Sequence, residues 1–169
     1  MMDVKRIMRH QIPNCGPDDT LNMAARIMWE EGCGSVLVVD PECRPVGFLT
    51  DRDICMAAYT QGRRLAEIKV ETAMARRIVC CAEEDDLSHA MKLMRDSCLS
   101  RLPVVDGQGV LVGLLSLDDL GCESQRILRG ATDRNLAGLV AEVYGSICST
   151  RCRRRHSPDP PLHSSPEWN

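Results

Sequence analysis

The stretch Gly47-Phe48-Leu49-Thr50-Asp51-Arg52-Asp53 decides the interpretation of this chain, because its pattern returns 66 residues later as Gly113-Leu114-Leu115-Ser116-Leu117-Asp118-Asp119. Each copy begins with an apolar run, continues into a hydroxyl residue, and carries a carboxylate three positions further on. An apolar run of this length predicts a buried strand. A hydroxyl residue followed by acidic residues is typical of the start of a helix. The motif therefore predicts a strand that runs directly into a helix, twice.

The rest of the chain repeats with the same spacing, and no gap is needed to align the two copies. The matched pairs are Val4 and Val70, Met8 and Met74, Asp19 and Asp85, Leu21 and Leu87, Val38-Val39-Asp40 and Val104-Val105-Asp106. Two copies are too few for a solenoid. We therefore expect two similar units, related by a pseudo-two-fold axis, that bury one face of each against the other.

Each copy predicts the element order β-α-β-β-α, which makes the fold α/β. Apolar residues at helical spacing from Leu21 to Met28 predict an amphipathic helix, and Asp19 is a plausible N-cap. Asp85 takes the same place before the second copy's helix. We expect the units to span residues 1–65 and 66–130. An amphipathic helix over 131–148, free to pack on the units or on a partner, and a disordered, basic, proline-rich tail over 149–169 should follow.

Composition narrows the class of protein. The chain has 169 residues, 44% of them apolar, a net charge of −3 and ten cysteines. It has neither a signal peptide pattern nor an apolar run long enough for a membrane span, so we expect a cytoplasmic protein with reduced thiols. The cysteines lack paired metal-ligand spacing, which predicts no metal site. The basic run Arg151 to Arg155 is interpreted as a solvated tail, with nucleic acid binding as the alternative.

The repeated motif carries the chemistry. Free amides at a helix N-terminus favour phosphate oxygens, as does the helix dipole, and the Thr50 hydroxyl could add a contact. A carboxylate such as Asp53, one turn along, suits the two cis hydroxyls of a ribose. Gly47 leaves room for close backbone approach. Ordinary helix capping would explain one copy. Two copies in matching contexts favour a nucleotide site.

These units resemble cystathionine-β-synthase (CBS) domains, of which a tandem pair forms a Bateman module. The resemblance rests on Leu102-Pro103-Val104-Val105-Asp106 standing before the second motif, and it covers Val4 to Leu128. The stretch Thr50-Asp51-Arg52-Asp53-Ile54 is similar to that of small bacterial proteins made of a CBS pair and little else. The resemblance implies an adenosine ligand, either AMP, ADP, ATP, S-adenosylmethionine or NAD, bound in clefts between the repeats.

The resemblance also implies roles for individual residues. Asp53 and Asp119 would hold ribose hydroxyls, while Thr50 and Ser116 would contact ribose or phosphate. The residues expected around the adenine, through backbone or as apolar walls, are Ile12, Pro13, Val46, Ile78, Val79 and Val112.

The two copies differ where phosphate would bind. The resemblance makes Arg101 the first choice for a phosphate contact and Arg52 the second. The first copy has Ser35 in place of Arg101, and the second has Asp118 in place of Arg52. Adjacent carboxylates in the second copy would repel a polyphosphate. We therefore expect one tight site and one weak or empty site.

Together these patterns predict a regulatory module rather than an enzyme, because the sequence contains no motif of a known catalytic set and needs no catalytic cofactor. Its expected partners are an adenosine ligand, an effector protein and, as the resemblance implies, a second copy of the chain in a homodimer formed through helices. The alternative is a structural interaction module with vestigial nucleotide sites that contacts its partner through the helix from Leu136 to Tyr144.

Overall fold

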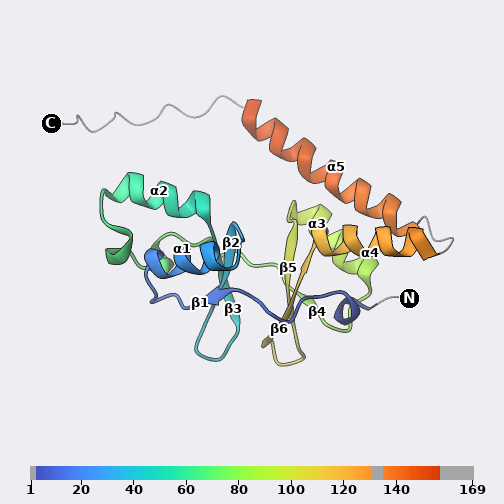
Figure 1. The fold of residues 1–169 in the computed structure, drawn as a ribbon, viewed down its shortest axis with the longest axis horizontal. Helices are drawn as coiled ribbons and strands as arrows, with labels where there is room; N and C mark the ends of the chain where they lie inside the picture. The colour runs from blue at the N-terminus through green and yellow to red at the C-terminus, as the bar shows by residue number, and fades with distance from the viewer. Residues whose placement is uncertain (1–2, 131–134, 157–169) are drawn as a thin grey trace.

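The structure is a computed structural model that describes residues 3–130 and 135–156, and it contains two three-stranded sheets flanked by helices (Figure 1). The first half comprises β1 (Asn14–Cys15), α1 (Leu21–Glu30), β2 (Ser35–Val39), β3 (Pro45–Thr50) and α2 (Asp51–Gln61). The second comprises β4 (Cys81–Ala82), α3 (Leu87–Ser97), β5 (Arg101–Val105), β6 (Leu111–Ser116) and α4 (Leu117–Gly130). Three short 3-10 helices are η1 (Val4–Arg6), η2 (Leu65–Glu67) and η3 (Val70–Thr72). The predicted β-α-β-β-α order and α/β class are confirmed.

The two sheets have the same topology and register. In each, a two-residue strand pairs in parallel with the middle strand, which pairs antiparallel with the third strand. Cys15 opposite Val38 corresponds to Cys81 opposite Val104. Side chains alternate along each strand, so Val36 and Val38 of β2 pack in the core of the first half. Leu37, which lies between these two valines, is also buried but faces the other side of the sheet.

The first strand of each half is only two residues long, and the helix cap of each half lies one residue later than predicted. In the first half, pairing begins at Asn14 because Pro13 has no N–H to donate, although its carbonyl accepts a hydrogen bond from Leu37 N at 3.1 Å. In the second half, pairing begins at Cys81. Thr20, and not Asp19, caps α1 by accepting from Met23 N.

The predicted caps are wrong by one residue in both repeats, for the same reason. The carboxylate of Asp19 accepts from Gly16 N at 2.8 Å, and that of Asp85 accepts from Ala82 N at 2.9 Å. Each carboxylate closes the turn before its helix. In the second repeat the next residue, Asp86, caps α3 by accepting from Ser88 N.

The segments that lead into the two repeats are exchanged between the halves. The N-terminal segment starts beside the second half and then crosses to β1 (Figure 1), and Val4 and Met8 are buried in the second core. Reciprocally, Val70 and Met74 are buried in the first core. The exchange ties the halves together, because neither core is complete without a segment from the other repeat.

This exchange corrects the interpretation of the motif glycine. A Cβ at Gly47 would lie 2.5 Å from the Sδ of Met74, and a Cβ at Gly113 would collide with the Sδ of Met8. The absent side chain therefore makes room for a buried methionine of the exchanged segment, and not for a ligand.

Helix α5 (Asn135–His156) packs along α3 and α4 of the second half (Figure 1). Val143 and Ile147 are buried in the second core, and Arg95 of α3 forms an ion pair with Glu142 at 3.2 Å. The amphipathic helix thus packs on the module itself. It continues past residue 148 to His156. Residues 131–134 and the tail over 157–169 lie outside the described residues.

In the part of the chain that the structure describes, no helix combines the length and the apolar character needed to cross a membrane.

Candidate functional site

Two cavities lie where the halves meet, and each is lined by residues of both. The first has a volume of about 610 Å³ and brings Thr50 and Asp53 of the first half against Ile78, Val79 and Arg101 of the second. Its volume falls within the range of small-molecule sites.

The second cavity, of about 660 Å³, is the counterpart of the first. It brings Ser116 and Asp119 of the second half against Pro13 of the first, with Arg101 again at its wall. The motif of one repeat therefore always faces the segment that leads into the other.

In the first cavity, Thr50 and Asp53 form a reciprocal cap at the start of α2. The Thr50 hydroxyl donates to Asp53 Oδ2 at 2.7 Å, Thr50 N donates to the same oxygen at 2.9 Å, and Asp53 N donates to Thr50 Oγ1 at 3.2 Å. Among the described residues, no hydrogen bond or ion pair engages Asp53 Oδ1. Capping and ligand binding are therefore compatible, since the cap uses one carboxylate oxygen and leaves the other available.

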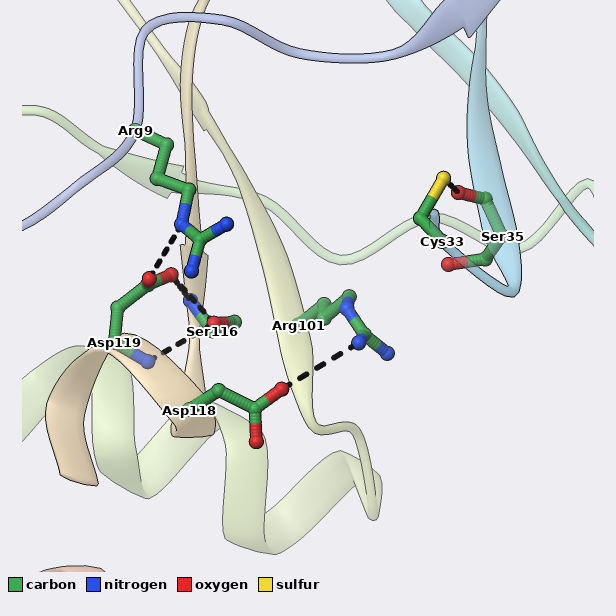
Figure 2. Close-up of polar contacts among 7 residues, drawn as sticks. All are labelled: Arg9, Cys33, Ser35, Arg101, Ser116, Asp118 and Asp119. Carbon is green, nitrogen blue, oxygen red and sulfur yellow. Dashed lines mark hydrogen bonds and ion pairs between the residues drawn. The ribbon is translucent and has the colours of Figure 1, made fainter. Parts of the chain in front are cut away.

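The second cavity has the same cap and one further contact (Figure 2). Asp119 Oδ2 accepts from the Ser116 hydroxyl at 2.5 Å and from Ser116 N at 3.2 Å. Asp119 Oδ1 accepts from the guanidinium Nε of Arg9 at 2.5 Å. Both oxygens of this carboxylate are thus engaged within the chain.

The cavities also differ in charge. The first is lined by three arginines and two aspartates, namely Arg52, Arg77, Arg101, Asp51 and Asp53. The second is lined by two arginines, three acids and one histidine, namely Arg9, Arg101, Glu31, Asp118, Asp119 and His10. With the histidine neutral, the first wall carries a net positive charge and the second a net negative charge. Anionic ligands therefore find a more favourable field in the first cavity.

Nine of the twelve residues predicted from the sequence line a cavity. The first cavity contains Thr50, Arg52, Asp53, Ile78, Val79 and Arg101, and the second contains Pro13, Ser116, Asp119 and, again, Arg101. Ile12, Val46 and Val112 line neither of these two cavities. The two valines pack instead against the hydrophobic cores of their own halves.

The apolar wall comes from the next residues along the same strands. Phe48 lines both cavities, and Leu114 lines the second. Phe48 and Leu114 are aligned by the 66-residue repeat, and strand alternation places them on the face opposite the core residues Leu49 and Leu115. If side chains alternate strictly along each strand, the buried positions of Leu49 and Leu115 predict that Phe48 and Leu114 face the cavities. No local signal identifies Arg9 or Arg77, because their positions depend on the exchanged segments.

Metal binding has no geometric support in residues 3–130 and 135–156, where no three His, Cys, Asp or Glu side chains gather in a way that could hold an ion.

Comparison with known proteins agrees with this architecture. The CBS domain family model matches twice, over residues 4–59 and 67–120. The chain is similar to the CBS domain-containing protein YhcV of Bacillus subtilis, with 35% identity over 71% of this chain and 84% of that protein. It is also similar to the uncharacterized protein MK0525 of Methanopyrus kandleri, with 30% identity over 70% of this chain and 61% of that protein. The chain therefore spans less than two thirds of the archaeal relative.

Among solved structures, the CBS domain pair of protein MJ0100 superposes with a TM-score of 0.64 at 22% identity, covering 74% of this chain and 97% of that one. That structure is a complex with 5-methylthioadenosine and S-adenosyl-L-methionine. At this identity the likeness shows the fold.

Proposed function

This chain belongs to the CBS domain family, and from that premise we propose that it is a regulatory module that binds an adenosine nucleotide between its repeats. The observation that carries the proposal is the arrangement at Asp53. Its carboxylate has one oxygen in the cap and one available, at the wall of a cavity of about 610 Å³ that also holds three arginines. A carboxylate oxygen suits ribose hydroxyls, and the arginines suit phosphate.

The adenosine part of the proposal draws on a structural relative. The MJ0100 domain pair is a complex with two adenosine derivatives. Phe48 offers this chain an aromatic wall for a purine ring, and Ile78 and Val79 offer apolar contacts from the other half. AMP, ADP, ATP, S-adenosylmethionine and NAD are the candidates, and the arginines favour those with phosphate.

The position of the cavity supports the regulatory role. Its walls come from both halves, whose proposed bounds are residues 1–65 and 66–130, so a ligand would contact both and stabilise one relative orientation. We propose that the module has no catalytic activity. It would pass its state to an effector protein or to a second copy of the chain.

The proposed homodimer would use α1 and α2. These helices expose Trp29, Met56 and Tyr59, whereas the helices of the second half pack against α5. A ligand-dependent change in the small-angle scattering profile would support transmission. An unchanged profile at saturating ligand would contradict it.

Binding is tested by a thermal-shift screen against AMP, ADP, ATP, S-adenosylmethionine and NAD. A ligand at about 100 times its dissociation constant should stabilise the fold by roughly 2.7 kcal/mol, which is a measurable rise in melting temperature. Asp53→Asn should abolish the rise, because it removes the carboxylate charge while keeping an acceptor for the cap. Asp96→Asn, on α3 and outside both cavities, is the matched control. If no nucleotide raises the melting temperature of the unmodified chain, the proposal fails.

A further inference from the structure

We infer that Arg9 closes the second cavity to ribose, so that the chain binds one nucleotide, at Asp53, and not two. The inference rests on the proposed nucleotide binding and deepens it. In this inference, the Arg9 side chain binds the Asp119 carboxylate in place of the ribose hydroxyls.

The surroundings of Arg9 are repeated almost identically in the other half. Arg9 and Leu114 exchange two backbone hydrogen bonds, both of 2.9 Å, at the edge of the second motif. Ala75 and Phe48 exchange the same two bonds, of 2.8 and 2.9 Å, at the edge of the first. Arg9 and Ala75 are 66 residues apart and therefore hold equivalent positions. The two sites thus share a backbone frame and differ in the side chain that the frame carries.

That side chain uses the carboxylate oxygen that a ribose would need. Arg9 Nε lies 2.5 Å from Asp119 Oδ1, while Oδ2 belongs to the cap with Ser116. The Asp119 side chain is only 10% exposed, whereas that of Arg9 is 65% exposed. The exposed guanidinium therefore points at and pairs with a nearly buried carboxylate (Figure 2).

A ribose would have to displace this guanidinium. Its hydroxyls offer Asp119 neutral donors in exchange for a cationic one, so the carboxylate would lose its attraction to a full positive charge. At Asp53 no such exchange is needed, because alanine at position 75 cannot reach the carboxylate. The charges of the cavity walls also favour binding of an anionic nucleotide at Asp53 over Asp119. The first cavity has more arginines than acids, and the second has more acids than arginines.

Exchanging the two side chains provides the test. Isothermal titration calorimetry would use adenosine or S-adenosylmethionine, whichever binds the unmodified chain more tightly, because neither carries a phosphate that the acids of the second cavity would repel. We expect one site in the unmodified chain and two in Arg9→Ala. Ala75→Arg should weaken the first site by about tenfold to a hundredfold, the range expected when a charged hydrogen bond must be broken first. The double exchange Arg9→Ala with Ala75→Arg should make the second cavity the tighter site, and Asp119→Asn should then abolish binding there.

Both residues are exposed, so these variants should fold. Two sites in the unmodified chain, or one site in Arg9→Ala, would overturn the inference and leave the proposed function standing. Absence of binding in every variant would overturn both.

A second readout does not depend on any ligand. In NMR spectra of the unmodified chain, the Nε–H of Arg9 should exchange slowly with water and should lose this protection in Asp119→Asn. Ala75→Arg should create a second protected signal that is lost when Asp53→Asn is added. An Arg9 signal that is unaffected by Asp119→Asn would overturn the inference directly.

Discussion

Arg101, which lines both cavities, forms an ion pair with Asp118 of the second cavity, with Arg101 Nη2 3.6 Å from Asp118 Oδ2 (Figure 2). Both side chains are more than a third exposed, so the pair contributes little to stability. A phosphate can offer the guanidinium two closer oxygens than this carboxylate does. Arg101 is therefore held near both sites without being committed to Asp118.

From this position we predict that Arg101→Ala weakens AMP binding by about tenfold to a hundredfold, the worth of a charge-assisted contact. Binding of adenosine, which has no phosphate, should not change. Calorimetry with both ligands makes the comparison, and Arg26→Ala on α1 serves as a control outside both cavities. An equal loss for adenosine and AMP would show that Arg101 acts on the shape of the cavity and not on the phosphate.

The motif glycine gives a prediction about stability. Gly47→Ala should lower the free energy of unfolding by about 1–3 kcal/mol, because its Cβ would lie 2.5 Å from Met74 Sδ and 3.3 Å from the carbonyl oxygen of Ala75. Gly107→Ala is the matched control, since no atom lies within 4 Å of its Cβ and the change should stay within about 0.5 kcal/mol. Urea denaturation measures both. If the two variants are equally stable, Met74 does not pack against the motif in solution.

Helix α5 should contribute measurably to the stability of the second half. Ile147→Ala removes a side chain that is 3% exposed and packed in the second core, so we expect a loss of about 2–5 kcal/mol. Leu139→Ala, in the same helix but 37% exposed, should cost less than about 1 kcal/mol. Equal and small losses in denaturation experiments would mean that α5 does not remain packed on α3 and α4.

Two buried thiols predict how stability depends on pH. Burial, with a smaller effect of the Asp19 carboxylate, raises the pKa of Cys15 from 9.0 to about 11. Burial, assisted by Asp85 and Cys80, raises the pKa of Cys81 to about 12. Above pH 9 the unfolded chain loses these protons while the folded chain keeps them, so the free energy of unfolding should fall as pH rises from 9 towards 12.

The thiol contribution can be separated from that of other groups by mutation. Cys15→Ala should make the alkaline decline in the free energy of unfolding less steep, whereas Cys55→Ala, at an exposed position, should leave its slope unchanged. Urea denaturation at several pH values above 9 provides the slopes. A slope that Cys15→Ala does not alter would assign the decline to other groups.

The sequence by itself determined the fold class, the two repeats and the hydroxyl–carboxylate pairs. These features depend on neighbours close along the chain. Strand and helix periodicity act over a few residues, and the cap joins Thr50 to Asp53 three positions away. One local prediction was nevertheless wrong, namely the N-cap of α1. The Asp19 carboxylate accepts from Gly16 N instead, so Thr20 caps the helix.

Only the tertiary structure decided how the repeats complete each other. Val4 and Met8 suit either of two similar cores, and their local sequence cannot tell which core they enter. Packing placed them in the second half, which brought Arg9 to a carboxylate 110 residues away. The same exchange filled the space beside Gly47 with Met74. The difference between the two sites thus arises from contacts between residues far apart in sequence, which no local pattern encodes.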